Sequence, residues 1–302
     1  SWQGLPARSF LDALHPDLSR FRYDHVHSCD EIVGLLDPAV AQRLGIPAAI
    51  PVAIGAIDAH FGAIGAGIKP GTLVKIMGTS TCDCMVAPII PGQPLPDIPG
   101  VCGVVPGSIL PAMIGIEAGQ SAVGDIFHWF ASRFGTQGSA SSTEQTLAAL
   151  TADAAALAPG QSGLLALDWH NGNRNVLTDP RLSGLLIGMS LATTPAEIYR
   201  ALIEATAFGA LRIMEQIQSH GIAIHDVINC GGIAEKNPLI MQIYADVCNR
   251  AMKVSRSSQT CALGAAICGS VVGGAHPSRA AAQAAMTGVR ETVHTPDPAR
   301  AA

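Results

Sequence analysis

The chain has 302 residues, of which 48% are hydrophobic and 14% charged, and this core-rich composition excludes intrinsic disorder. Eighteen basic residues stand against 23 acidic ones, for a formal charge of −5, and no Lys/Arg cluster is present. This balance argues against a nucleic-acid partner. The length suits one large domain or two unequal ones.

From the N-terminal end, short helices are predicted over residues 6–14 and 37–44, and a strand over 50–57. The apolar runs 72–77 and 81–87 are joined by a short turn that contains Gly, a pattern that predicts a hairpin. The following proline-rich stretch predicts a loop with short strands.

The middle of the chain predicts helices over residues 119–134 and 141–158, followed by a short strand over 164–167. In the first of these helices Val123, Phe127 and Phe130 recur at helical spacing. The second is expected to lie on the surface.

The clearest helix signal is Thr194-Pro195-Ala196-Glu197, which has the form of a capping box with Pro at the first helical position. Ile198, Leu202, Ala205 and Phe208 are expected to share one face of this helix, and Gly221 suits its C-terminal end. The remaining elements are a strand over 227–230, a turn at Gly231-Gly232, a helix capped by Asn237, a strand over 252–255 and a helix from 262. Alternating strands and helices predict an α/β fold in which helices pack on a mixed sheet.

Eight cysteines are scattered through mostly apolar runs, and no secretory signal begins the chain. This pattern indicates a reduced, cytoplasmic protein. Cys82-Asp83-Cys84 suggests a metal site, but its one-residue gap and the lack of a matching downstream pair favour ordinary buried thiols, so no metal-binding residue is predicted. The uncharged stretch 257–278 contains too many polar residues and glycines for a membrane span.

Asp58 follows an apolar run and is bounded by glycines at 55 and 62. A carboxylate in such a place suits a catalytic base or a metal ligand, because the ends of strands carry the ligand sites of α/β sheets. It equally suits an acidic cap for the next helix. The glycines from 62 to 67 only half resemble a dinucleotide loop, because their spacing is wrong, and a dehydrogenase is therefore disfavoured.

Three further segments carry candidate binding groups. Gly78, Thr79 and Ser80 offer backbone N–H groups and hydroxyls to phosphate oxygens, or form a plain hairpin turn. Gly231 and Gly232 permit a base or ribose to lie flat on the backbone, or form a tight connection. Glu117, at a predicted helix start, serves the helix dipole or binds the hydroxyls of a polyol.

Taken together and in this order, these segments resemble the FGGY family of carbohydrate kinases. The matching stretches, which run from about Trp2 to about Gly274, are GAIDAH around Asp58, KIMGTSTCD up to Asp83, IEAGQS around Glu117, LDWHNGNR up to Arg174, ATAFGA up to Ala210 and GGIAEKNPLIMQ from Gly231. Within the family, the Thr-Cys-Asp and Asp-Trp-His-Asn-Gly elements are most similar to the branch that phosphorylates L-ribulose in arabinose breakdown.

The resemblance implies an actin-like ATPase fold of ribonuclease-H-like domains and the use of ATP and Mg²⁺. It implies that Asp58 is the catalytic base and also contacts the sugar, and that Glu117 binds sugar hydroxyls. It assigns nucleotide contacts to a set of residues in three segments: Gly78, Thr79, Ser80, Gly119, Gln120, Gly231, Gly232 and Asn237.

The resemblance also implies a domain division. Residues 1–68 would be the end of a first domain, and residues 69–302 the nucleotide-side domain. Because the phosphate loop of the family is missing and the chain begins without Met, a piece of a longer protein is expected, inactive by itself. The expected partner is a small sugar, with neither nucleic acid nor membrane, and a homodimer is left open. Alternatives are another FGGY kinase, of xylulose or glycerol type, or a non-catalytic nucleotide-binding protein, which would not need Asp58 and Glu117 together.

Overall fold

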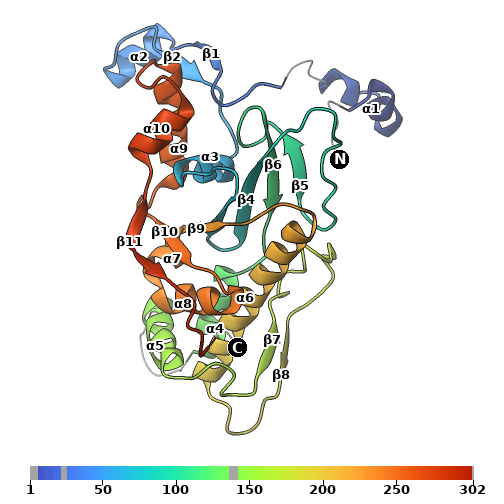
Figure 1. Cartoon of the computed structure of the whole chain (residues 1–302), viewed down its shortest axis with the longest axis vertical. Coiled ribbons are helices and arrows are strands. Elements are labelled where there is room, and N and C mark those ends of the chain that lie inside the picture. Colours follow the sequence, from blue (N-terminus) through green and yellow to red (C-terminus); the bar gives the residue numbers. More distant parts are fainter. Residues whose placement is uncertain (1–5, 22–25, 136–141, 301–302) are drawn as a thin grey trace.

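The computed structural model describes residues 6–21, 26–135 and 142–300. Its strands are β1 (Ile32–Leu35), β2 (Pro51–Ala53), β3 (Thr72–Met77), β4 (Thr81–Pro88), β5 (Gly103–Pro106), β6 (Met113–Ala118), β7 (Leu165–Leu167), β8 (Leu185–Ile187), β9 (Asp226–Cys230), β10 (Met252–Ser255) and β11 (Val289–His294). Its helices are α1 (Arg8–Leu14), the 3₁₀ turn η1 (Leu18–Phe21), α2 (Pro38–Leu44), α3 (Asp58–Gly65), α4 (Gly124–Phe134), α5 (Thr143–Ala155), α6 (Pro195–Ser219), α7 (Gly232–Lys236), α8 (Pro238–Cys248), α9 (Thr260–Val272) and α10 (Arg279–Met286). The expected α/β class is confirmed (Figure 1).

Within the described residues, the central sheet has seven strands in the order β11-β10-β9-β3-β4-β6-β5. Strands β3, β9 and β10 are parallel, and β3 pairs with β4 as the predicted antiparallel hairpin. Strand β6 is antiparallel to β4 and therefore runs in the same direction as β3. The carboxyl ends of β3, β6, β9 and β10 consequently lie along one edge of a mixed sheet, and this edge is called the carboxyl edge below.

Both faces of the sheet are covered, and all of β3 except Thr72 and Lys75 is apolar. Leu73 and Met77 pack into a core with α4, α5, α6 and α8, whereas Val74 packs into a second core with α3, α9 and α10. Figure 1 shows these two groups of helices on opposite sides of the strands. A strand that is buried on both faces has no solvent side and therefore no polar alternation.

Helix α6 begins as its sequence predicts. The Thr194 hydroxyl accepts a hydrogen bond from the Glu197 amide, and the Glu197 carboxylate accepts one from the Thr194 amide, so both halves of the capping box are present. Leu202 and Ala205 are buried, but Phe208 is 53% exposed, and its expected place on the buried face is wrong. Phe208 lies ten residues after Ile198, which at about 100° per residue turns it roughly 80° away from that face.

Several predicted boundaries are corrected by the structure. The strand expected over 50–57 is only Pro51–Ala53, and the helix expected over 119–134 begins at Gly124. Gly119 has a φ of +155° and a Cβ there would lie 2.0 Å from the Thr81 carbonyl oxygen, so the chain at 119 follows the edge of the sheet. The helix expected over 141–158 is α5, capped by Ser142, and residue 141 lies outside the described residues.

Helices α3 and α9 pack unusually closely because each presents a glycine to the other. A Cβ on Gly65 would lie 2.0 Å from the Thr260 carbonyl oxygen, and one on Gly264 would lie 1.8 Å from that of Phe61. The glycines of α3 therefore serve helix packing, which explains why their spacing does not suit a dinucleotide loop.

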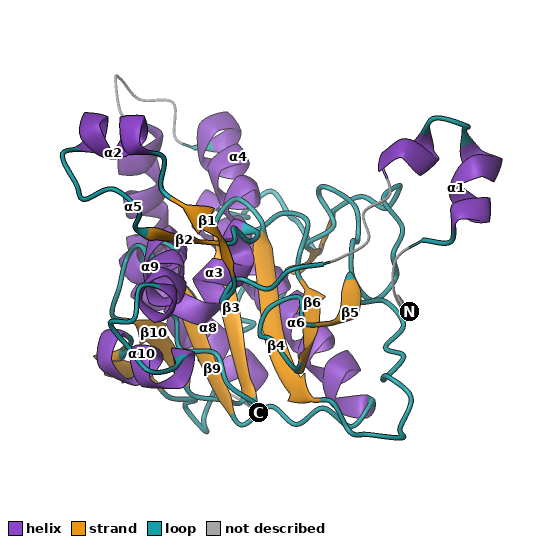
Figure 2. Ribbon diagram, turned by 90° about the horizontal axis from the view of Figure 1, so that it is seen from above, coloured by secondary structure: helices purple, strands orange, loops and turns teal. Residues whose placement is uncertain are grey.

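The N-terminal elements are arranged at the periphery. Strands β1 and β2 form an antiparallel pair, and β2 contacts α9. Helix α1 has no buried residue, and Figure 2 shows it set apart from the sheet. Over the residues that the structure describes, no helix combines the length and hydropathy that crossing a bilayer requires.

Candidate functional site

The turn between β3 and β4, residues 78–80, lies at the carboxyl edge beside the start of α4. The Gly78 carbonyl accepts a hydrogen bond from the Gly124 amide at 3.1 Å, and the Thr79 carbonyl accepts from Val123 at 2.8 Å and Asp125 at 3.1 Å. Thr79 is exposed and Ser80 half-buried. The hairpin-turn interpretation is thus confirmed, and the hydroxyls of Thr79 and Ser80 remain candidates for a ligand.

Glycines allow the C-terminal ends of β3 and β9 and the N-terminal end of α4 to approach one another closely. Gly231, at φ +95°, directly follows β9, and a Cβ there would lie 2.4 Å from the Met77 carbonyl oxygen. A Cβ on Gly124 would lie 2.5 Å from the Gly78 carbonyl oxygen. Gly232 is different, because a Cβ there would meet nothing within 4 Å. Gly124 is not among the residues predicted from the sequence, where its signal is a second glycine, after Gly119, within the helix expected over 119–134.

Asn237 has a structural role that the sequence predicts correctly. Its side-chain oxygen accepts a hydrogen bond from the Ile240 amide at 3.1 Å and so caps α8, and its Nδ2 donates to the Thr151 hydroxyl at 3.3 Å. The single turn expected at 231–232 is instead followed at once by α7, which begins at Gly232. The expected contact of Asn237 with a nucleotide stays a prediction.

Glu117 does not stand at a helix start, so its interpretation as a helix-dipole residue is wrong. It lies on β6, and the helix begins seven residues later at Gly124. Its Oε2 is 3.1 Å from Nε2 of His60, and 37% of its side chain is exposed. The hydrogen bond from His60 lowers the pKa of Glu117, and partial burial opposes this shift.

Asp58 is the first residue of α3, five residues after the last strand residue, Ala53. Its carboxylate is exposed and accepts a hydrogen bond from the Ala59 amide at 2.8 Å. The residue in the N-cap position is Ile57, which makes no side-chain cap. Because Asp58 precedes His60 by two residues on one helix, the His60–Glu117 contact links the helix that carries Asp58 to β6.

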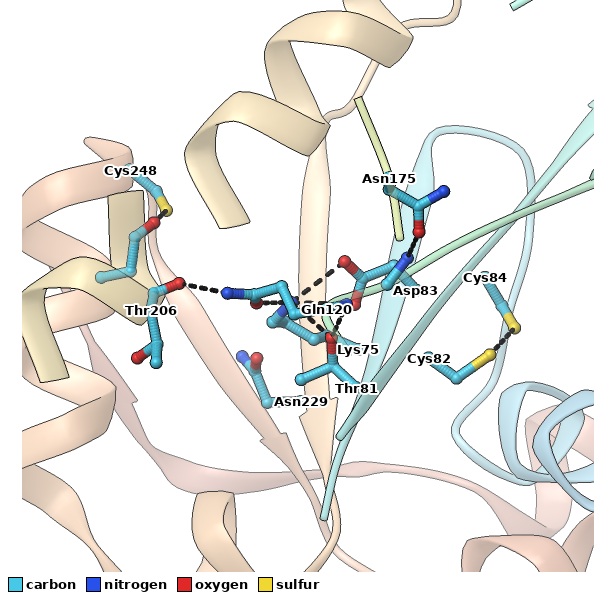
Figure 3. A network of polar contacts seen from close by, with 12 residues as sticks. Lys75, Thr81, Cys82, Asp83, Cys84, Gln120, Asn175, Thr206, Asn229 and Cys248 are labelled. Atoms are coloured by element: carbon cyan, nitrogen blue, oxygen red, sulfur yellow. Dashed lines mark hydrogen bonds and ion pairs between the residues drawn. The ribbon is translucent and has the colours of Figure 1, made fainter. Parts of the chain in front are cut away.

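Gly119 and Gln120 are held by a network of buried polar groups (Figure 3). The Gly119 amide donates to Oδ1 of Asn175 at 2.6 Å. The Gln120 side chain, only 5% exposed, donates to Asp168 at 2.7 Å and to the Thr206 carbonyl at 2.8 Å. The side chain of Gln120 is therefore fully engaged inside the protein, and its expected contact with a nucleotide stays a prediction.

A buried ion pair lies at the centre of the same network. Lys75, with no exposed surface, donates to both oxygens of Asp83 at 2.9 and 3.0 Å and to Oε1 of Gln120 at 3.1 Å. Burial raises the pKa of Asp168, and its hydrogen bond from Gln120 opposes this shift. Charges this deeply buried are tolerated only with such complete pairing.

Arg174 is a second residue that the sequence analysis did not assign. It is exposed, and its Nη2 donates to the Thr81 carbonyl at 2.8 Å and to the Gln120 carbonyl at 3.3 Å. A cavity of about 260 Å³ borders it and is also lined by Asp168 and Arg212. These bonds hold the guanidinium at the carboxyl edge, because Thr81 directly follows the turn 78–80. Its signal in the sequence is the only cation in the stretch 168–175.

Cys82 and Cys84 point the same way from β4, with their sulfur atoms 3.8 Å apart. Over the described ranges, the structure brings together no group of three or more His, Cys, Asp or Glu side chains suited to a metal ion.

Comparisons with known proteins identify the family to which this fold and its glycine-lined edge belong. Residues 73–272 match the C-terminal domain of the FGGY family of carbohydrate kinases, and the chain belongs to this family. It is similar in structure to a xylulose kinase from Rhodospirillum rubrum, with a TM-score of 0.77, 25% identity, and coverage of 96% of this chain and 56% of that one. A gluconate kinase from Lactobacillus acidophilus has the same fold, with a TM-score of 0.79, 18% identity, and coverage of 98% and 57%. The expected actin-like ATPase fold is confirmed.

Two curated relatives that match the chain are ribulokinases. A ribulokinase from Halalkalibacterium halodurans is 45% identical over 283 residues, which are 90% of this chain and 49% of the relative. A ribulokinase from Mycolicibacterium smegmatis is 42% identical over 310 residues, which are 97% of this chain and 53% of the relative. The chain thus spans about half the length of the curated relatives it matches.

Proposed function

We propose that this chain supplies the nucleotide-side half of a kinase that transfers the γ-phosphoryl group of ATP to a pentulose, converting L-ribulose to L-ribulose 5-phosphate. One observation carries the proposal. The turn 78–80, the glycines at 124 and 231 and the carboxylate of Glu117 line the same edge of one sheet, and the His60 contact ties Asp58 to that edge. The curated relatives named ribulokinase support this choice of sugar.

Asp58 would act as the base. Phosphoryl transfer depends mainly on positioning and charge stabilisation, and an Asp that accepts the proton of the attacking hydroxyl is a recurring component. Asp58 suits this role because its carboxylate is exposed and accepts a hydrogen bond only from its own helix in the contacts described. Glu117, ionised at neutral pH, would accept hydrogen bonds from other hydroxyls of the same sugar.

ATP would lie along the glycines. A Cβ on Gly124 or Gly231 would strike a backbone carbonyl, whereas the space beside Gly232 is open and suits a bulky polyphosphate. The hydroxyls of Thr79 and Ser80 would face its phosphates, whereas the first amides of α4 already donate to the carbonyls of the turn. Mg²⁺ would be held chiefly by the phosphate oxygens and water, as is usual for this ion at nucleotide sites. It supplies charge neutralisation to the transferred group.

The division of the chain follows from the same proposal. Residues 69–302 would form the nucleotide-side domain, and residues 1–68 would belong to a sugar-side domain that corresponds to the part of the relatives not matched here. The proposed kinase acts in the cytoplasm and needs that remaining domain for turnover. Placing base, acceptor and phosphoryl group in line contributes several kcal/mol to catalysis, and one wall of a cleft cannot do so.

The test measures ADP release by the full-length kinase, with ATP and each of three substrates: L-ribulose, D-xylulose and glycerol. We expect the highest kcat/KM for L-ribulose and no sugar-dependent ADP release by residues 1–302 alone. A preference for D-xylulose or glycerol would assign another branch of the family. ATP binding without turnover of any of the three would indicate a non-catalytic nucleotide-binding protein, and turnover by residues 1–302 alone would refute the division into halves.

A further inference from the structure

His60 is a buried polar residue next to the proposed base. It is 6% exposed, although it lies in the first turn of a helix whose N-terminal residue, Asp58, is exposed. Its Nε2 is 3.1 Å from Oε2 of Glu117, whose carboxylate is half-buried. Neither residue is sequence-adjacent to the other, so the contact depends on the packing of α3 over the end of β6.

The packing of α3 fixes where His60 points. Gly65 and Gly264 lock α3 against α9, so the helix is held in one place beside the sheet. Side chains two residues apart on a helix point about 200° apart. Asp58, which is exposed, therefore points away from His60, whose ring contacts Glu117 on β6, and one helix carries both side chains.

Glu117 depends on donors around it. His60 is the strongest influence lowering the pKa of this carboxyl, followed by weaker contributions from Cys82 and Arg174, while burial opposes all of them. His60 contacts Oε2, and the other carboxylate oxygen is not engaged by it. A half-buried carboxylate on a strand has several rotamers available, and a fixed donor selects one of them.

We propose that His60 is a positioning residue that holds one oxygen of Glu117 so that the other is presented to a sugar hydroxyl. This inference rests on the proposed function. Helix α3 would then have two roles. It carries the proposed base, Asp58, and through His60 it orients Glu117, the residue of β6 that would bind the sugar. The competing explanation is that His60 merely anchors α3 to the sheet.

Two substitutions in the full-length kinase separate these explanations. His60→Leu removes the donor, and His60→Gln retains an N–H near the position of Nε2. Because a hydrogen bond to a charged group contributes on the order of tenfold or more to an equilibrium, we expect His60→Leu to raise KM for L-ribulose at least about tenfold with KM for ATP unchanged. His60→Gln should restore KM to within about threefold. The matched control is His225→Leu, which changes an exposed histidine at the opposite edge of the sheet.

A second readout follows the carboxylate directly. In protein labelled with ¹³C at Glu side-chain carboxyls, the signal of Glu117 is assigned by its loss in Glu117→Gln. Its pKa should rise in His60→Leu and return toward the wild-type value in His60→Gln. A lowered Tm with unchanged KM and an unchanged Glu117 titration would overturn the positioning role. Failure of the wild-type kinase to phosphorylate any of the three substrates would instead overturn the proposed function, and the sugar-binding part of this inference with it.

Discussion

Two carboxylates of the chain are in opposite circumstances, Asp83 on β4 and Asp58 at the start of α3. Asp83 is 1% exposed, and both of its oxygens accept hydrogen bonds from the fully buried Lys75 (Figure 3). Asp58 is exposed and accepts a hydrogen bond from the neighbouring Ala59 amide. The buried charge of Asp83 is compensated by Lys75, whereas the carboxylate of Asp58 is open to solvent. Position in the sequence beside a glycine-rich motif does not by itself separate the two roles.

The largest effect that separates the buried carboxylate from the exposed one is expected at Lys75, the partner of Asp83. Lys75→Met leaves Asp83 charged and buried without its partner, and we expect a loss of about 3–5 kcal/mol in the free energy of unfolding. Urea denaturation provides the measurement. The control is Lys253→Met, which breaks a half-exposed ion pair with Asp226 and should cost less than about 1 kcal/mol.

A double variant sharpens this result. Lys75→Met combined with Asp83→Leu removes both charges, and much of the lost stability should return because no uncompensated charge remains. If the double variant were as unstable as the sum of the two single variants, the network would stabilise the fold through its hydrogen bonds and not through charge compensation.

At the exposed carboxylate the effect should appear in the rate. Asp58→Asn in the full-length kinase should lower kcat at least about a hundredfold, because a general base contributes roughly that much, with ATP binding and unfolding free energy nearly unchanged. Asp153→Asn, an exposed substitution on α5, is the matched control. Turnover of Asp58→Asn at nearly the wild-type rate would limit Asp58 to its bond with the Ala59 amide.

The adjacent residues Gly231 and Gly232 differ in a similar way, because Gly231 is closely packed and Gly232 is open. Gly231→Ala should destabilise the fold by about 1–3 kcal/mol, because φ is +95° and the new Cβ would meet the Met77 carbonyl. Gly232→Val has room in the structure, so its stability should be preserved while ATP affinity falls about tenfold. Calorimetry with ATP and with L-ribulose distinguishes the cases. Equal loss of both ligands in Gly232→Val would indicate misfolding, and loss of neither would move the nucleotide elsewhere.

The local features of the fold were predictable because short-range rules determine them. The hairpin of β3 and β4, the capping box at Thr194 and the cap at Asn237 depend on residues within a few positions of one another. The start of α4 was not predictable, because residues 119–123 follow the sheet edge through contacts with Thr81 and Asn175, which are distant in sequence.

The candidate site divides in the same way. Asp58 and the turn 78–80 are marked by flanking glycines, so the sequence analysis identified them. His60, Gly124 and Arg174 acquire their positions only when α3, α4 and the segment 168–175 converge on the edge. The nucleotide contact of Gln120 is implied by the resemblance to the family and stays a prediction. The burial of its side chain beside Lys75 and Asp168 depends on long-range packing that no local pattern encodes.

The smallest expected effect concerns Glu117, which lies between the two extremes because 37% of its side chain is exposed. Its pKa is lowered in the folded protein, first by the His60 hydrogen bond. The resulting stabilisation is present above the unfolded-state pKa of about 4.3 and is lost as the pH falls through the lower folded-state value. Solvent screening should limit it to less than about 1 kcal/mol. Urea denaturation of wild type and Glu117→Gln at several pH values should therefore show a difference at pH 6 that shrinks below about pH 4, with Glu291→Gln, on an exposed part of β11, showing no such change. If this difference in unfolding free energy grew as the pH fell, the protonated carboxyl of Glu117 would be the better partner of His60. Glu117 would then resemble the buried Asp83 more than the exposed Asp58.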